Sequence, residues 1–338
     1  MKIKYISPLI IALCLLFVCI GCTSTSHQKK ATGWTNDGGR IKVLCTTGMV
    51  RDLVATVGQD RIEVITLIKE ELDPHTYELV KGDDEKLLSA DLVFYNGLGL
   101  EHSPNIHRHL KEHPQSFALG DYICQKKPDQ IVYVNNQLDP HIWMDISLWE
   151  EGVDLVTQAL IDFDPSQSSF YLENGEKLHQ QMKTAHHNIY ELLQQVPEKQ
   201  RYLVTCHDAF NYFTRSYLST EEECKSNQWQ KRCKAPEGLS PDSQLSMSDI
   251  KDVVDHLREY NIQIIFPESN VNLDSIHKIK DVAKKMGFTL YVAPSALYAD
   301  SLGKDGEGQD SYLKMLTYNA EMIAKCLKSK EAYESKSI

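Results

Sequence analysis

The stretch PSQSSFYLENGEKLHQQMKTAHHNIYELLQQV, residues 165–196, decides the fold that the rest of the chain predicts. It has no proline after its first residue, and its apolar residues recur at about the spacing of one helical face. Pro165 suits the first turn of a helix, and Pro197 ends it. A helix of roughly 30 residues is long for a globular protein. The stretch therefore predicts one rigid helix that connects two lobes.

Short β-rich stretches alternate with helical ones on both sides of this helix. Strands are expected at 41–45, 61–68, 91–96, 131–134, 201–205, 262–266 and 289–293. Strands that alternate with helices indicate βα units and mostly parallel sheets. We therefore expect an α/β fold with an amino-terminal lobe at 41–164, the linking helix at 165–196 and a carboxy-terminal lobe at 197–338.

The first residues are typical of an export signal. Two lysines precede an apolar run that is short for a membrane span, and a polar stretch follows at once. Gly21-Cys22 resembles the end of a bacterial lipobox, although Cys19 stands where leucine is usual. We therefore expect a signal peptide at 1–22, a flexible tether at 23–40, and a protein that is exported. It would then lie in the periplasm or on the extracytoplasmic side of the membrane, anchored through a lipid on Cys22.

Composition and charge exclude one class of partner. The 338 residues are 42% hydrophobic and 25% charged, which is ordinary for a folded protein, and the formal net charge is -11. No dense tract of lysine and arginine is present, and a nucleic-acid surface depends on such tracts. We therefore expect no nucleic-acid partner.

An Asp-Pro-His triplet occurs twice, in ELDPHTYELV (71–80) and in QLDPHIWMDI (137–146). The proline of each triplet biases the preceding aspartate towards extended geometry and stiffens the loop. A histidine that binds a metal ion needs such stiffening, because its ring must be held in place before the ion arrives. The repeat therefore predicts two loops that present His75 and His141 in the same way.

A third histidine and a carboxylate follow other predicted strands, where ligands bind in open parallel sheets. These are His207, after YLVTC, and Asp300, after LYVAPSALYA. A single histidine is more often a surface or capping residue, but three histidines and one carboxylate suit a divalent transition metal. Asp145 and Asp208 are candidates to hold the second ring nitrogens, and N-capping of helices is the alternative for both.

Four stretches occur in order within residues 41–328 and carry a family resemblance. They are LDPHTYE, LDPHIWMD, CHDAFNYF and YADSLGKDG with SYLKML. Together they resemble the signatures of metal-binding substrate-binding proteins of zinc, manganese and iron ABC importers, the cluster A-I or TroA-like family. The resemblance implies two βα lobes joined by one rigid helix, with the ion in the cleft between them. It also implies a monomer, without enzymatic activity, that delivers the ion to a membrane permease.

The ligand positions that the resemblance implies are His75, His141, His207 and Asp300. Three imidazoles and a carboxylate suit tetrahedral zinc, and nitrogen-rich sites rank zinc above iron and manganese. Zinc is therefore the expected cargo, with manganese and iron as the alternatives.

Two segments depart from the family pattern. Histidines crowd the stretch EHSPNIHRHLKEHPQS at positions 102, 107, 109 and 113. They indicate either a solvated helix or loop face, or a patch that gathers metal ions weakly. The stretch 219–240 is longer than the usual connection, and its Cys224 and Cys233 could close a small disulfide loop outside the cytoplasm.

Two other functions compete with metal import. A zinc hydrolase needs an open coordination position and usually a His-Glu-x-x-His pair, which this chain lacks. Glu268 is the one carboxylate near a strand end that could act as its base, but a helix cap or a hydrogen bond between the lobes is the preferred role for it. A surface adhesin lipoprotein fits the anchor, but it gives the four-residue constellation no purpose.

Overall fold

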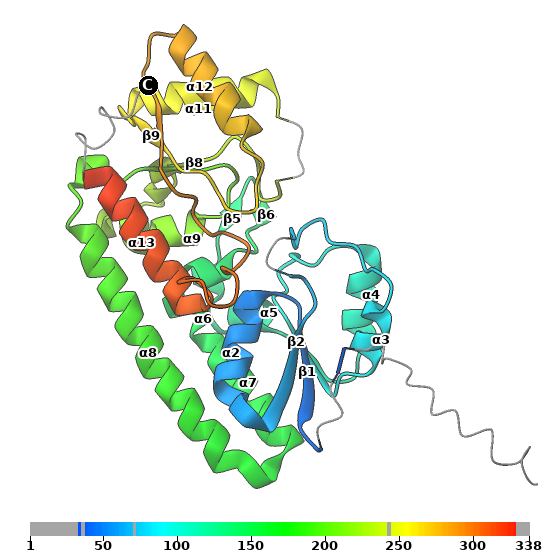
Figure 1. Ribbon diagram of the computed structural model, residues 1–338. Coiled ribbons are helices and arrows are strands. Elements are labelled where there is room, and N and C mark those ends of the chain that lie inside the picture. The colour runs from blue at the N-terminus through cyan, green and yellow to red at the C-terminus, as the bar shows by residue number, and fades with distance from the viewer. Residues whose placement is uncertain (1–32, 35–37, 70–71, 242–244, 329–338) are drawn as a thin grey trace, which may run out of the picture.

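The computed structural model describes residues 33–34, 38–69, 72–241 and 245–328. Helix α8 (Ser168–Gln194) runs along one side of the molecule, and two bodies of βα structure lie against it (Figure 1). The long helix and the α/β fold with mostly parallel sheets are as the sequence predicts.

The amino-terminal body is built on a parallel four-stranded sheet in the order β2-β1-β3-β4. The strands are β1 (Ile41–Cys45), β2 (Ile62–Thr66), β3 (Leu92–Tyr95) and β4 (Ser116–Ala118). Successive side chains of a strand point to opposite faces of the sheet. Val43 and Cys45 accordingly belong to the main core, whereas Leu44 and Val93 belong to a smaller one. Both faces of this sheet are therefore covered.

Helices on both faces bury this sheet (Figure 1). The helices of this body are α2 (Gly48–Gly58), α3 (Asp83–Leu88), α4 (Pro104–Glu112), α5 (Leu119–Lys126), α6 (Ile146–Trp149) and α7 (Glu151–Phe163). Helices α2 and α7 pack on each other and on α8. Helices α3 and α4 cover the other face, where Leu87, Ile106 and Leu110 surround Leu44 and Val93.

The carboxy-terminal body holds shorter strands, which form the parallel pairs β7-β8 and β9-β10. The strands are β7 (Leu203–Val204), β8 (Cys233–Lys234), β9 (Ile264–Ile265) and β10 (Tyr291–Val292). The helices are α9 (Asn211–Phe213), continued by a π-helix at Thr214–Leu218, then α10 (Glu221–Lys225), α11 (Met247–Glu259), α12 (Asp274–Lys285) and α13 (Tyr312–Lys328). Helix α13 turns back from this body and packs on α8 and α2.

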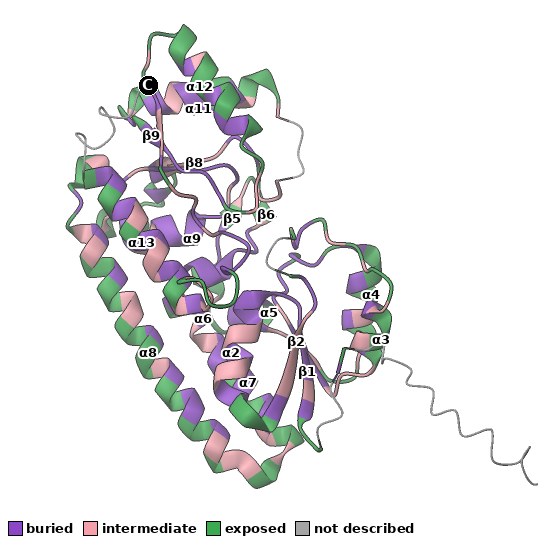
Figure 2. Ribbon diagram, in the orientation of Figure 1, coloured by how far each residue is buried: buried purple, intermediate pink, exposed green. Residues whose placement is uncertain are grey.

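One continuous hydrophobic core joins the two bodies, since it contains residues of α2, α7, α8 and α13. Polar contacts cross it as well. Trp143 Nε1 donates to the Ala299 carbonyl at 2.9 Å, and the Tyr312 hydroxyl donates to the Trp143 carbonyl at 2.6 Å. Asp52 accepts a hydrogen bond of 3.0 Å from the Tyr312 N–H. Figure 2 shows buried residues on the inner sides of α2, α8 and α13, with exposed residues along the outside of α8.

The structure corrects some predicted elements. The expected strand at 131–134 is only β5 (Tyr133–Val134), which pairs with β6 (Gln137–Leu138) as an antiparallel hairpin. His141 therefore follows a hairpin and not a strand of a parallel sheet. Trp34, in the segment predicted as a flexible tether, is 4% exposed and packs in the smaller core, so the packed structure begins before residue 41.

The predicted signal peptide, with Cys22, lies outside the described residues. None of the helices in the described part of the chain combines the length and the apolar character that a membrane crossing requires. Cys224 and Cys233 form no disulfide in the structure. Their thiols donate to the Arg215 carbonyl and to Asn211 Oδ1, respectively.

Candidate metal centre

The three histidines and the aspartate that the sequence singles out meet in one place. One ligand atom from each side chain lies within 4.8 Å of the other three, and all four residues are buried. The Asp300 carboxylate lies 3.1 Å from His207 Nε2 and 3.4 Å from His141 Nε2. His75 Nε2 lies 3.2 Å from His141 Nε2. Four Lewis-basic groups from distant parts of the sequence therefore face one point.

The two Asp-Pro-His triplets fold into the same turn. Asp73 Oδ1 accepts a hydrogen bond of 2.8 Å from the N–H of His75, and Asp139 Oδ1 accepts one of 2.9 Å from the N–H of His141. An aspartate that binds the backbone two residues further on forms an Asx turn. The proline between them has no N–H of its own to satisfy. The triplet therefore recurs because it is a compact device for holding a histidine at the end of a turn.

A carboxylate holds the ring of His141. His141 Nδ1 and Asp139 Oδ1 form a hydrogen bond of 2.7 Å, and both side chains are fully buried. Asp139 Oδ2 accepts a second hydrogen bond, of 3.0 Å, from Asn211. With Nδ1 directed at the carboxylate, Nε2 is left facing the other ligands, as is usual for histidines that bind metals.

A second carboxylate holds His207. Glu268 Oε2 lies 2.5 Å from His207 Nδ1, and Glu268 Oε1 accepts hydrogen bonds from the backbone N–H groups of Cys206 and His207 at 2.7 and 2.9 Å. Glu268 is 2% exposed. One carboxylate thus fixes both the ring and the backbone of this ligand, and it leaves Nε2 directed at Asp300.

The atoms at the meeting point have no other partner among the described residues. Both carboxylate oxygens of Asp300 and Nε2 of His207 are buried without a hydrogen bond. Buried polar atoms are nearly always paired, and each unpaired one requires an explanation such as an ion. Three imidazole nitrogens and a carboxylate are ligands that borderline transition metals prefer. The residues present therefore fit a metal ion as cargo.

Without an ion, the electrostatics of the site favour the metal-binding forms of His75 and Asp300 but the protonated form of His207, which must release a proton when a metal binds. Burial lowers the pKa of His75 to about 3, so this ring is neutral at neutral pH. Burial also acts to lower the pKa of His207, but the carboxylates of Glu268 and Asp300 raise it well above its ordinary value. Burial acts to raise the pKa of Asp300, and the facing His207, His141 and His75 lower it, so that the carboxylate is ionised.

The prediction that Asp145 and Asp208 hold the ligand rings is wrong, because other carboxylates contact these rings. Asp145 accepts from the N–H of Ser147 and caps α6, which is the alternative role that the sequence left open. Asp208 is buried, with a pKa raised to about 6 by burial and by Asp139, and it makes no described contact with a ligand ring. The supporting residues are Asp139 and Glu268. The sequence contains a signal for Asp139, because this residue begins the second Asp-Pro-His triplet.

The four histidines at positions 102–113 have different surroundings in the structure. His109 Nε2 lies 3.1 Å from Asp84 Oδ1, and His113 Nε2 contacts the Ala90 carbonyl at 3.2 Å. His107 is exposed on α4. His102 is also exposed, and its ring centroid lies 6.5 Å from that of His75. Only His102, among these four described residues, is therefore beside the candidate site.

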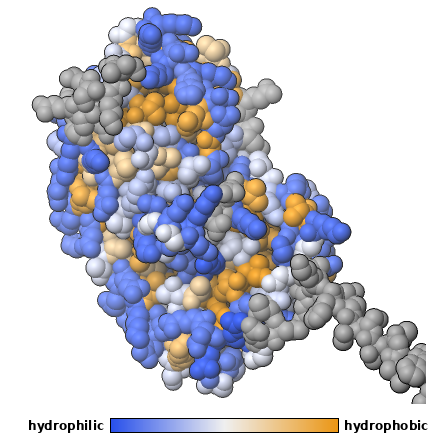
Figure 3. Space-filling view, viewed as in Figure 1, coloured by the Kyte–Doolittle hydropathy of each residue, from blue (hydrophilic) through white to orange (hydrophobic). Residues whose placement is uncertain are grey.

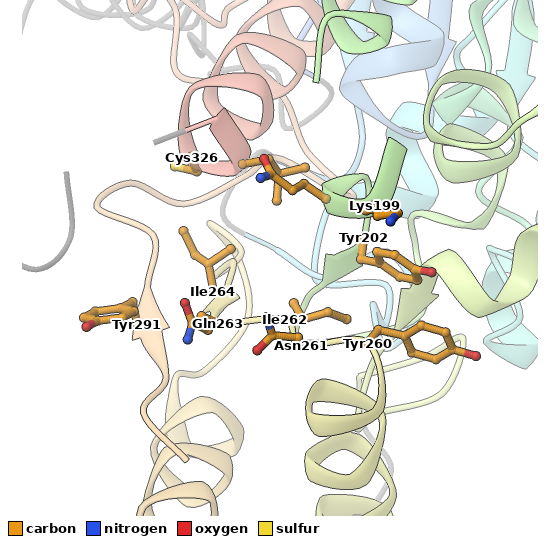
Figure 4. Close-up of a pocket in the computed structure, with 11 residues that line it drawn as sticks. Lys199, Tyr202, Tyr260, Asn261, Ile262, Gln263, Ile264, Tyr291 and Cys326 are labelled. Carbon is orange, nitrogen blue, oxygen red and sulfur yellow. The ribbon is translucent and has the colours of Figure 1, made fainter. Parts of the chain in front are cut away.

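A separate pocket lies in the carboxy-terminal body, between β9, β10 and the end of α13 (Figure 4). Tyr202, Tyr260 and Tyr291 line it together with apolar residues and Lys199. Its described lining contains no histidine or carboxylate, so this pocket does not share the chemistry of the metal centre. Figure 3 shows a mainly hydrophilic surface on the viewed face, with a notch between the carboxy-terminal body and the part that carries α4.

Comparisons with known proteins agree with this geometry. The family model of ZnuA, described as the periplasmic component A of a zinc-uptake complex, matches residues 43–326. Metal-binding protein YtgA of Chlamydia pneumoniae is 37% identical over 306 residues, which cover 90% of this chain and 89% of YtgA. Manganese-binding lipoprotein MntA of Bacillus subtilis is 30% identical over 313 residues, which cover 92% of this chain and 96% of MntA.

A solved structure shares the architecture over most of the chain. The crystal structure of Fe(III)-bound YtgA from Chlamydia trachomatis matches with a TM-score of 0.80 and 36% sequence identity. The match covers 85% of this chain and 98% of that one. None of these three relatives is described as a hydrolase or an adhesin. The chain belongs to the ZnuA family, and it is therefore a metal-binding substrate-binding protein of the ABC-importer type.

Proposed function

We propose that this chain captures one transition metal ion outside the cytoplasm through His75, His141, His207 and Asp300, and delivers it to a membrane permease. The observation that carries the proposal is the convergence of four buried ligand atoms within 4.8 Å. Binding replaces the water of the ion with three imidazoles and one carboxylate, which leaves a formal charge near +1 for a divalent ion. Asp139 and Glu268 hold two of the rings in place before the ion arrives.

Zinc is the cargo that we propose first. Three imidazoles and one carboxylate suit a tetrahedral ion, and the affinity of such sites rises from manganese through iron to zinc. The matching family model is described as zinc-uptake, whereas relatives are named for manganese and for Fe(III). These two metals are therefore the competitors that an experiment must include.

The same proposal covers where the protein is located and whether it acts as a monomer. We expect the predicted signal peptide at 1–22 to direct export, and a lipid on Cys22 to hold the protein at the membrane near its permease. The lobes at 41–164 and 197–338 supply ligands from both sides of the site. We expect the protein to act as a monomer, because all four ligands come from one chain, and to have no enzymatic activity, because its family consists of metal-binding transport components.

Elemental analysis of the chain from residue 23 onward tests the proposal. The protein is stripped with a chelator and exposed anaerobically to equal, limiting amounts of zinc, manganese and iron. We expect one ion per chain, mainly zinc, and loss of that ion in His141→Ala. His187→Ala, which removes an exposed histidine of α8, serves as the matched control and should keep the ion. Retention of the ion by His141→Ala, or no bound ion in the unaltered chain, would overturn the proposed site.

A separate experiment tests whether the protein is a hydrolase. A panel of chromogenic esters and phosphates is incubated with the zinc-loaded chain, with and without a chelator. We expect no turnover above that of free zinc. Turnover that requires the protein and is lost in His141→Ala would favour the hydrolase instead.

A further inference from the structure

Solvent reaches the candidate metal centre at one ligand. The side chain of His75 is 3% exposed, whereas those of His141, His207 and Asp300 are each 0% exposed. An ion that enters this conformation therefore meets His75 before it meets the other three ligands. The surroundings of His75 decide how the ion arrives.

His102 stands beside His75 on the exposed side. The centroids of the two rings are 6.5 Å apart, with an interplanar angle of 48°. The rings of the three histidine ligands are 5.1 to 6.2 Å from one another, and the His75–His141 pair has the same interplanar angle. The spacing of His102 and His75 is thus only slightly larger than that of rings positioned to share one ion. A small side-chain movement would let both imidazoles bind a single ion at about 2.0–2.1 Å.

The residues on either side of His102 are anchored. Glu101 is buried and accepts hydrogen bonds from Thr46 Oγ1 at 2.6 Å and from the N–H groups of Asn96 and Gly97 at 2.8 and 3.1 Å. These bonds tie the turn before His102 to the carboxyl ends of β1 and β3.

The residue after His102 is tied to the loop that carries His75. Ser103 is buried, and its hydroxyl donates to Glu78 Oε2 at 2.9 Å. The backbone of His102 is therefore fixed relative to His75, although its ring is free to meet solvent. An exposed ring on a fixed backbone is suited to picking up an ion at a defined place.

We propose that His102 and His75 form a two-imidazole capture site for a borderline divalent ion such as zinc. In the first step a nitrogen of His102 replaces one water of the hydrated ion. His75 then replaces a second water, and the ion leaves His102 as the inner ligands replace the rest. The proposal rests on the proposed function, because it gives an entry route to the same four-ligand site.

A capture ligand has a kinetic signature. His102 binds the ion on the way in and on the way out, but it does not hold the ion in the final site. Its removal therefore raises the barrier between free and bound ion without changing the energies of either end. Association and dissociation should slow by the same factor, and the dissociation constant should stay the same.

Stopped-flow fluorescence with zinc alone measures both rates. Trp143 supplies the signal, since its ring centroid lies 5.3 Å from that of His141. We expect His102→Ala and His102→Gln to lower both rate constants by about tenfold, which corresponds to about 1.4 kcal/mol on the barrier. His107→Ala removes an exposed histidine of the same cluster and should leave both rates unchanged.

The outcomes separate this inference from the proposed function. Equal slowing of both rates in the two His102 variants, with zinc still bound, supports the capture site. Unchanged rates overturn it and leave the four-ligand site standing. Faster dissociation with a weaker dissociation constant also overturns it, because His102 would then belong to the final site or to its structure. Failure of the unaltered chain to bind zinc, manganese or iron overturns both proposals.

Discussion

Asp139 and Asp145 are two buried carboxylates in one short stretch, and they do different work. Asp139 holds the backbone and the ring nitrogen of His141, whereas Asp145 caps the first turn of α6 through Ser147. Their exposed fractions, 0% and 4%, do not separate them. What separates them is the position of the carboxylate relative to the imidazole.

This difference predicts unequal effects of one substitution made at two sites. Asp139→Asn removes the carboxylate that bonds to Nδ1 of His141, so the ring loses its fixed orientation. We expect a loss of about 10–100-fold in zinc affinity, as is usual for such supporting residues. Titration calorimetry with a competing chelator measures the affinity.

Asp145→Asn is the matched control for that experiment. We expect it to lower stability by about 1 kcal/mol through the weakened cap, with little change in zinc affinity. Equal losses of affinity in both variants would mean that Asp139 acts through the fold and not through His141.

The sequence predicted which four side chains come together better than it predicted the carboxylates that hold them. Spacing after strands and the repeated triplet brought His75, His141, His207 and Asp300 together, and the structure gathers the same four. Glu268 was not predicted as a support, because a contact between residues more than 60 positions apart leaves no local pattern. Asp145 carried the local pattern of a support, and it proved to be a cap.

Helix α8 depends on a glycine where it crosses α7. A Cβ atom at Gly175 would lie 2.6 Å from Thr157 Oγ1, so the two helices approach closely at this point. Alanine is a better helix former than glycine by about 1 kcal/mol, which alone would stabilise α8. Overpacking costs about 1–3 kcal/mol and opposes it.

We therefore expect Gly175→Ala to destabilise the protein by about 1–2 kcal/mol in urea denaturation, despite its higher helix propensity. The pair Gly175→Ala with Thr157→Ala removes the clashing atoms and should be at least as stable as Thr157→Ala alone. A stabilising single substitution would show that α7 and α8 can separate without cost.

A buried ion pair fastens the segment 219–240, the stretch that contains two cysteines. Arg232 is 2% exposed, and its Nε donates to Glu223 at 2.5 Å. The same guanidinium donates to the Glu198 carbonyl, just beyond α8, at 2.8 Å. Burial acts to raise the pKa of Glu223, but the hydrogen bonds from Arg232 and from the Thr220 N–H lower it to about 2.

This lowered pKa predicts how stability depends on pH. The carboxylate is ionised in the folded state down to about pH 2, whereas its ordinary pKa is 4.5. The contribution of this carboxylate to the free energy of unfolding is therefore complete above about pH 4.5 and is lost as the pH falls towards 2. We expect Glu223→Gln to cost about 2–3 kcal/mol at pH 7, since it breaks a buried pair.

The check is chemical denaturation of both proteins from pH 7 to pH 2.5. The difference in the free energy of unfolding between the unaltered chain and Glu223→Gln should become smaller below pH 4.5. Glu222→Gln, at the exposed neighbouring position, should match the unaltered chain throughout. A difference that stays constant with pH would assign the effect to packing instead of charge.

Helices and strands were predicted correctly where the sequence pattern was long. The prediction failed where contacts with distant residues determine the secondary structure. The stretch 165–196 gave a 27-residue helix because many turns share one apolar face. The stretch 131–134 has the same β-rich composition as true strands, yet it only forms a two-residue arm of a hairpin. β-Propensity reflects packing on neighbours, and a four-residue window does not contain those neighbours.

For the whole molecule, the continuous core implies that the two bodies unfold together. The core that contains Val43 of the first sheet also contains Phe266 and Leu297 of the second body. Helix α13 fixes this arrangement, because the N–H of Tyr312 donates a hydrogen bond to Asp52 of α2 and its hydroxyl donates one to the carbonyl of Trp143 beside the site. Separation of the bodies would expose this core and break these bonds.

We therefore expect a single thermal transition in calorimetry, with van 't Hoff and calorimetric enthalpies nearly equal. Zinc should shift the whole transition upward, because its proposed ligands come from both bodies. The added stability is about 4 kcal/mol when free zinc is 1,000 times the dissociation constant. Tyr312→Phe removes the hydroxyl that bonds to the Trp143 carbonyl and leaves the ring, so it should lower the midpoint while the transition stays single. Two transitions, of which zinc moves only one, would instead mean that the bodies are independent and that the ion is held within one of them.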